Sequence, residues 1–154
     1  MPGGDYAATV QAIRNVAAGG AAPTARLQRA MELIQARHPQ YEWVGIYLLR
    51  GGMLELGPYV GAPTDHTRIP VGRGVCGTAV AERANQVIED VLELDNYLAC
   101  SSTVRSEIVV LIWEGDTILG HMDVDCDEVG AFGPVDEAFL TQVAAILAPL
   151  LKHA

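Results

Sequence analysis

The sequence lacks any long apolar run and any targeting signature. No window approaches about 18 uninterrupted apolar residues, roughly the length that a transmembrane helix needs. Residues 1–6 contain no basic stretch followed by an apolar segment, as a secretory signal would. We therefore expect a soluble, cytoplasmic protein without a membrane partner.

Basic residues are also scarce. Ten Lys and Arg residues stand against nineteen Asp and Glu residues, which gives a formal net charge of −9, and the acids are scattered along the chain. A surface of this kind repels phosphate backbones and anionic membranes. We expect no nucleic-acid partner.

Cysteine is sparse, and its pattern is not that of a metal site. The chain contains Cys76, Cys100 and Cys126, with no CxxC pair that would suggest structural zinc. In a reducing compartment such cysteines are reduced thiols at rest, or redox-active ones. The sequence predicts neither a bound metal nor a cofactor.

The length and the hydrophobic pattern indicate one α+β domain over residues 1–154. Half of the 154 residues are apolar, enough for one core but too few for two domains. Apolar stripes predict terminal helices over 6–18, from an N-cap at Thr24, and from 134 onward. Two hairpins are predicted, over 41–59 and 107–125, with a short helix near 78–83 between them. This order is typical of an antiparallel sheet covered by terminal helices.

The stretch 72–77 satisfies the GxGxxG pattern, but its surroundings do not fit a dinucleotide site. Such a site needs a long helix and then a parallel strand, whereas here the helix is short and later strands form hairpins. We expect the glycines instead to let the backbone turn sharply and bring Cys76 close to another group.

Acidic residues alternate along the last predicted strand. Alternation places His121, Asp123 and Asp125 on one face and Cys126 on the other. Glu128 and Pro134 occupy the places where a calcium-binding EF-hand loop needs Gly and Glu, which excludes that loop. Two acids on one face of an apolar strand require a cation, a proton or solvent. An exposed edge with solvated acids remains the alternative, and His121 by itself predicts only a packed or solvent-facing residue.

Two further features suggest a site without deciding it. Trp43 and Tyr47 share a strand face on either side of Gly45, which leaves either a slot for a small apolar group or ordinary core packing. Cys100 lies in a polar segment where loop amides, hydroxyls and Arg105 can favour a thiolate. From these residues alone, Cys100 is as consistent with an inert thiol as with a reactive one.

Taken together, these segments resemble the GAF-domain free methionine-(R)-sulfoxide reductases. The resemblance rests on residues 68–79, Cys100, 106–110 and 123–125. It implies a six-stranded antiparallel sheet with the N- and C-terminal helices on one face and a ligand pocket on the other, commonly in a homodimer. It also implies that Cys100 attacks the sulfoxide sulfur and leaves a sulfenic acid, which a second thiol converts to a disulfide that thioredoxin reduces.

The same resemblance assigns the substrate contacts. Glu107, Asp123 and Asp125 match carboxylates that hold the amino-acid ammonium and protonate the sulfoxide oxygen. Trp43 and Tyr47 match aromatics that enclose the methyl group.

The chain departs from the family at the second thiol. His66 stands where the family typically carries a cysteine that is often the resolving one. Cys76 is the replacement that we expect, and Cys126 is the weaker candidate because alternation turns it toward the core. Two alternatives stay open: a non-enzymatic GAF sensor that binds a small metabolite, and a pocket that has lost efficient recycling.

Overall fold

A six-stranded antiparallel sheet organises the protein. The computed structural model describes residues 5–94 and 103–154, and within them the strand order is β3-β2-β1-β6-β5-β4. The strands are β1 (Trp43–Arg50), β2 (Met53–Val60), β3 (Arg68–Pro70), β4 (Gln86–Ile88), β5 (Ser106–Glu114) and β6 (Thr117–Cys126). All neighbouring strands pair antiparallel. The predicted α+β class and six-stranded sheet are confirmed.

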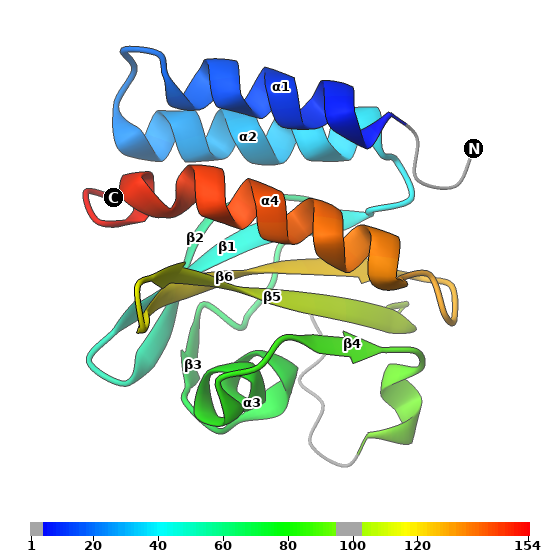
Figure 1. The fold of residues 1–154 in the computed structure, drawn as a ribbon. Coiled ribbons are helices and arrows are strands. Elements are labelled where there is room, and N and C mark those ends of the chain that lie inside the picture. The colour runs from blue at the N-terminus through cyan, green and yellow to red at the C-terminus, as the bar shows by residue number, and fades with distance from the viewer. Residues whose placement is uncertain (1–4, 95–102) are drawn as a thin grey trace.

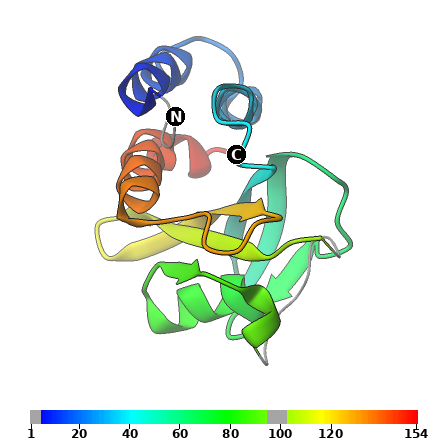
Figure 2. The ribbon, with the colours of Figure 1, turned by 90° about the vertical axis from the view of Figure 1, so that its right-hand side faces the viewer.

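Helices cover the two faces of the sheet unequally (Figures 1 and 2). The long helices α1 (Tyr6–Ala17), α2 (Pro23–Arg37) and α4 (Pro134–Leu151) lie on one face. The short helix α3 (Gly74–Glu82) lies against the opposite face, where it contacts β5 and β6, and the 3₁₀ turn η1 (Val91–Glu93) follows β4. The terminal helices are therefore on one side, as expected.

Side-chain alternation divides the interior into two apolar layers. Val44 and Met122 belong to the layer beneath the long helices, whereas Tyr47 and Val109 belong to the layer beneath α3. Because these residues alternate along shared strands, one sheet supplies both layers. The layer beneath α3 contains the site described below.

Two helix starts differ from the sequence prediction. The prediction that Thr24 caps the second helix is wrong, because α2 begins at Pro23 with Ala22 as its N-cap. Proline suits the first helical position, since its φ is already helical and its missing N–H would have no partner there. The third helix begins at Gly74 rather than near Thr78, and the antiparallel β4 follows it, which excludes the dinucleotide interpretation.

Helix α4 is long and apolar enough, by length and composition, to cross a membrane. Its Leu140, Val143 and Leu147 are fully buried, and the helix contacts β5 and β6. The apolar character of α4 is therefore explained by its packing in the core of the domain.

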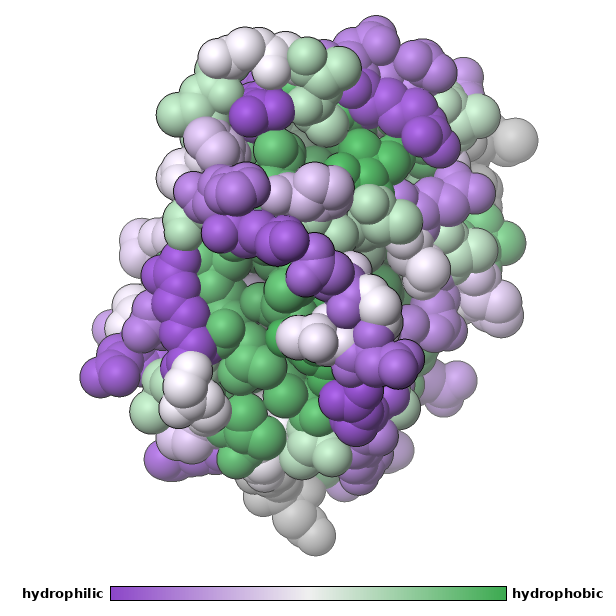
Figure 3. All heavy atoms as spheres, turned by 60° about the vertical axis from the view of Figure 1, so that its left-hand side comes forward, coloured by the Kyte–Doolittle hydropathy of each residue, from purple (hydrophilic) through white to green (hydrophobic). Residues whose placement is uncertain are grey.

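One face of the molecule gathers apolar residues between hydrophilic ones (Figure 3). Near the C-terminal end of α4 a groove of about 360 Å³ is lined in part by Trp113, Ala145, Ala148 and Pro149. None of the residues that line this groove belongs to the predicted site.

Gly120 allows β6 to approach β1. A Cβ built on Gly120 would lie 2.1 Å from the carbonyl oxygen of Tyr47, which is much closer than any real contact. The two strands pair from Trp43↔Asp125 to Leu48↔Gly120. Any side chain at this position would push the end of this ladder apart.

We expect Gly120→Ala to lower the free energy of unfolding by about 2–3 kcal/mol, a typical cost of overpacking. Urea denaturation of both proteins measures this change. Gly20→Ala is the matched control, because a Cβ there would meet nothing within 4 Å; it should change stability by less than about 0.5 kcal/mol. Equal effects of the two substitutions would contradict the steric argument.

Candidate active site

Three carboxyl groups lie buried on the sheet face beneath α3. Glu107 on β5 pairs with Asp125 on β6, and Asp123 lies two residues before Asp125 on the same face. Their exposed fractions are 3% for Glu107, 0% for Asp123 and 2% for Asp125. Because β6 lies between β1 and β5, the alternative of solvated acids on an exposed edge is wrong.

Helix α3 brings a thiol to these acids. The helix begins at Gly74, so Cys76 lies in its first turn, facing the sheet. The Cys76 Sγ lies 3.6 Å from Asp123 Oδ2 and 3.9 Å from Glu107 Oε2. This agrees with the expectation that the glycine-rich stretch brings Cys76 close to another functional group.

Burial keeps protons on this cluster. The pKa of Glu107 is raised well above its ordinary value, first by burial and then by the charges of Asp123 and Asp125. Burial also raises the pKa of Asp123. Neither Glu107 nor Asp123 forms an ion pair with a Lys or Arg among the described residues. The cluster can therefore donate a proton at a pH where ordinary carboxyl groups are ionised.

One oxygen of this cluster remains available. Within residues 5–94 and 103–154, Asp123 Oδ1 is buried and has no hydrogen-bond partner. A buried carboxylate oxygen without a donor is costly. It marks a place where a ligand could donate a hydrogen bond.

The aromatic residues pack differently from the slot that the sequence suggested. Trp43 and Tyr47 do share this face, and their rings stack with centroids 6.5 Å apart. However, the space above Gly45 is filled by the Trp43 indole, because a Cβ on Gly45 would lie 2.5 Å from Trp43 Cη2. The indole also stacks on Tyr59 and donates to the carbonyl of Ala62. Gly45 thus makes room for the tryptophan ring rather than for a ligand.

Cavities adjoin both ends of this cluster. One of about 140 Å³ is lined by residues that include Trp43, Thr103 and Asp125. A smaller one of about 10 Å³ is lined by residues that include His66, Cys76 and Glu107. The hydroxyl of Tyr47 donates to the His66 carbonyl at 2.8 Å, which holds this loop beside the smaller cavity.

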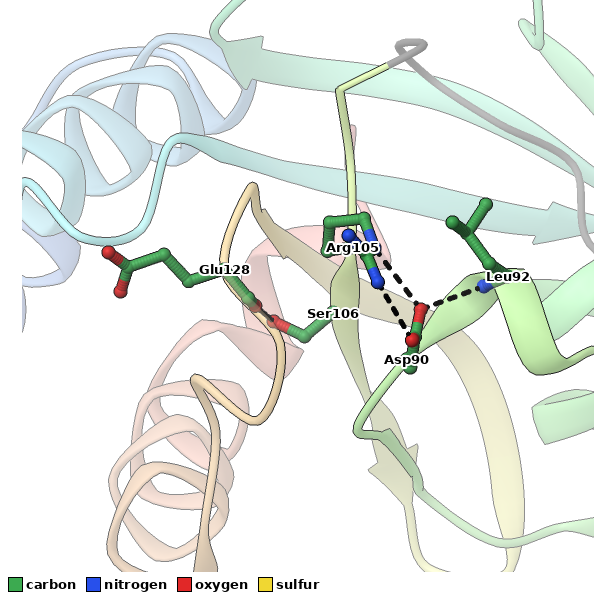
Figure 4. A network of polar contacts seen from close by, with 5 residues as sticks. All are labelled: Asp90, Leu92, Arg105, Ser106 and Glu128. Carbon is green, nitrogen blue, oxygen red and sulfur yellow. Dashed lines mark hydrogen bonds and ion pairs between the residues drawn. The ribbon is translucent and has the colours of Figure 1, made fainter.

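Cys100 lies outside the described residues, but the chain on either side of it is firmly held. Figure 4 shows Arg105 paired with Asp90, with Nη2–Oδ2 and Nε–Oδ1 distances of 2.9 and 3.3 Å. Asp90 also accepts from the Leu92 amide, and the Val91 amide donates to the Arg105 carbonyl at 2.7 Å. These contacts join the chain before and after residues 95–102 at one place. Because Cys100 lies outside the described residues, the expectation that Arg105 favours a thiolate on it stays a prediction. The Arg105 guanidinium itself is paired with Asp90.

The comparisons with known proteins agree with one another. A family model described as GAF domain matches residues 22–150. The free methionine-R-sulfoxide reductase of Escherichia coli is 41% identical over 134 residues, which cover 87% of this chain and 81% of that one. The chain belongs to the GAF-domain family of free methionine-R-sulfoxide reductases.

Solved structures of reductases in this family share the fold closely. The enzyme of Neisseria meningitidis, solved in complex with its substrate, superposes with a TM-score of 0.89 at 33% identity, covering 96% of this chain and 89% of that one. The reduced fRMsr of Staphylococcus aureus gives 0.87 at 35% identity, covering 96% and 95%.

Cys126, at the end of β6, lines the cavity of about 140 Å³ together with Asp125, but its side chain packs on the other face of the sheet. It belongs to the apolar layer beneath the long helices, and its Sγ lies 3.4 Å from Glu42 Oε2. Burial raises the pKa of this thiol to about 11. The orientation inferred from strand alternation is therefore confirmed.

The sequence left His121 as a packed or a solvent-facing residue, and the structure shows that it is packed. Its side chain is fully buried on the face of Asp123 and packs against Tyr47, with ring centroids 5.1 Å apart. Among the described residues neither ring nitrogen has a hydrogen-bond partner, and burial lowers the pKa to about 3. His121 is thus a neutral polar group beside the acids. The signal available in the sequence was its alternation with Asp123 and Asp125.

The raised pKa of Glu107 should make the protein less stable as pH increases. Above about pH 4.5 the unfolded chain loses this proton before the folded protein does, so stability falls until the folded pKa is passed. Glu107→Gln stays neutral and should be more stable than wild type near pH 8. The gain should exceed about 1 kcal/mol near pH 8 and vanish near pH 4.

Urea denaturation at the two pH values measures this effect. The exposed Glu93→Gln is the matched control, and it should alter stability by less than about 0.5 kcal/mol at both. A Glu107→Gln protein that is less stable than wild type at pH 8 would show that the ionised carboxylate is favourable.

Proposed function

We propose that this chain reduces free methionine-(R)-sulfoxide with Cys100 as the nucleophile. The observation that carries the proposal is the buried cluster of Glu107, Asp123 and Asp125, beside the Cys76 thiol. The similarity to the reductases of Escherichia coli and Neisseria meningitidis supports the choice of substrate.

The acids suit both ends of this substrate. A free amino acid carries an ammonium group, which requires anionic or acceptor oxygens when it leaves water. The sulfoxide oxygen must gain protons as its bond to sulfur breaks. A cluster whose carboxyl pKa values are raised by burial can supply a carboxylate to the ammonium and a proton to the oxygen.

The electrons come from thiols. The Cys100 thiolate attacks the sulfoxide sulfur, the oxygen passes to the cysteine, and methionine leaves, so the thiol becomes a sulfenic acid. A second thiol condenses with the sulfenic acid to give a disulfide and water. Thioredoxin then reduces the disulfide through its own dithiol. In this scheme Trp43 and Tyr47 provide the apolar wall that contacts the substrate methyl group.

Cys76 is the resolving thiol in this scheme. Its side chain lies on the face of the acids, whereas Cys126 lies beneath the long helices. His66 lines the smaller cavity together with Cys76, so the position where the family resemblance implies a cysteine lies beside Cys76. A disulfide between Cys76 and Cys100 would therefore take the place of the usual pair. We further propose that the enzyme works as a homodimer in the cytoplasm.

A thioredoxin-coupled assay that follows NADPH oxidation tests the nucleophile and its partner. Cys100→Ser should abolish turnover, because no sulfenic acid forms. Cys76→Ser should release about one methionine per protein in a single turnover and then stop, because resolution is lost. Cys126→Ser is the matched control and should keep the wild-type rate.

Mass spectrometry of the sulfoxide-treated protein should detect a disulfide that links Cys76 to Cys100. Undiminished turnover in Cys100→Ser would overturn the proposal. Tight binding of the sulfoxide by wild type without any turnover would favour the GAF sensor instead.

Masking the ammonium tests the role of the acids. N-acetylmethionine sulfoxide should be reduced with a kcat/KM about 10–100-fold lower than that of the free amino acid. This factor corresponds to the free energy that hydrogen bonds to a charged group typically contribute. Asp123→Asn should lower kcat/KM for the free amino acid and shrink the ratio between the two substrates. An unchanged ratio in this variant would mean that Asp123 does not bind the ammonium.

A further inference from the structure

The cluster beneath α3 has the composition of a metal site as well as that of an amino-acid site. One ligand atom each from Cys76, Glu107 and Asp123 lies within 4.8 Å of the others, and all three side chains are buried. The three residues come from three elements, α3, β5 and β6, which hold them from different directions. This is a thiol with two carboxyl groups around one point, not a patch of surface acids.

Two further observations concern the polar atoms and the space around this point. Asp123 Oδ1 is buried without a hydrogen-bond partner among the described residues, although Asp123 Oδ2 accepts from the Cys76 thiol. The adjoining cavity of about 10 Å³ is lined by Cys76 and Glu107, though not by Asp123, and His66 and Arg73 also line it. A space of this size is close to the minimum that holds one water, and so can admit an ion of similar size.

We propose that Cys76, Glu107 and Asp123 bind a zinc-type divalent cation when substrate is absent. The donor set of one sulfur and two oxygens suits Zn²⁺, which accepts thiolate and carboxylate ligands in a four-coordinate arrangement. Mg²⁺ and Ca²⁺ prefer oxygen ligands alone. Cys76, Glu107 and Asp123 would supply three of its four ligands. Binding releases the Cys76 proton to solvent and changes no oxidation state.

This site would make the metal an inhibitor of the reductase, a consequence that rests on the proposed function. The ion would occupy the place of the substrate ammonium, because both need Glu107 and Asp123. It would also hold the Cys76 sulfur as a metal ligand, so that the thiol could not condense with a sulfenic acid. Zinc should therefore compete with methionine sulfoxide, and a chelator should restore activity.

The chain contains a second thiol-and-acid group that serves as an internal control. Cys126, Glu42 and Asp127 also present ligand atoms within 4.8 Å of one another. Here both acids are exposed, and Glu42 Oε2 already accepts from the Cys126 thiol and the Asp127 amide. Because these two acids are exposed to water, whereas Glu107 and Asp123 are buried, we expect the metal at Cys76.

Titration of the reduced, metal-free protein with Co²⁺ tests the site without any substrate. Cobalt bound to a thiolate gives a charge-transfer absorption in the near ultraviolet, which should saturate at one ion per chain. The absorption should persist in Cys100→Ser and Cys126→Ser and disappear in Cys76→Ser. Zn²⁺ should displace the cobalt, and Mg²⁺ at the same concentration should not.

The carboxyl ligands are tested separately, in case Cys76→Ser fails to fold. Glu107→Gln and Asp123→Asn keep the thiol, so each should retain the absorption while weakening Co²⁺ binding at least about tenfold. No thiolate absorption in the wild type, or an absorption that survives in Cys76→Ser but not in Cys126→Ser, would overturn the proposal. Unchanged affinity in both carboxyl variants would overturn it as well.

The two proposals fail in different ways. If cobalt binds at Cys76 but methionine sulfoxide is not turned over, the metal site stands and the reductase function does not. If turnover is normal and cobalt does not bind, the reverse is true. Inhibition by zinc that is competitive with the sulfoxide, and weaker in Asp123→Asn, supports both.

Discussion

The burial of carboxyl groups on the central strands of the sheet is the constraint that the site depends on. A carboxylate in an apolar interior is strongly disfavoured unless it is protonated or meets a cation. Glu107 and Asp123 sit in such a place, with a thiol as their neighbour and no described basic side chain paired with them. The resting protein therefore holds protons on this cluster.

Apolar packing elsewhere in the fold offsets the free-energy cost of burying these acids. Helices α2 and α4 bury Ile34 and Leu140 against the back of the same strands, and α1 packs on α2 and α4. On the front face, α3 covers the acids, and the Asp90–Arg105 pair fixes the chain on either side of the segment that carries Cys100 (Figure 4).

The sequence predicted the hairpins and the terminal helices because each has a strong hydrophobic period. It also placed Asp123 and Asp125 on one face, since alternation along a strand is a geometric property. The start of α3 was predicted too late because glycine is a poor helix former, and tertiary contacts overrode that preference. The filling of the space at Gly45 by Trp43 depends on how rings pack between strands, which no single-strand pattern encodes.

The division of one sheet between two apolar layers has an evolutionary consequence. Residues of the layer beneath the long helices and residues of the layer beneath α3 alternate on β1, β5 and β6. Neighbouring positions in the sequence are therefore under different selection. Substitutions at every second position can change what the pocket recognises while the helix-packing positions, and with them the fold, are retained. In such a scaffold, substitution of a few side chains on the face beneath α3 can convert a metabolite sensor into an enzyme, or the reverse.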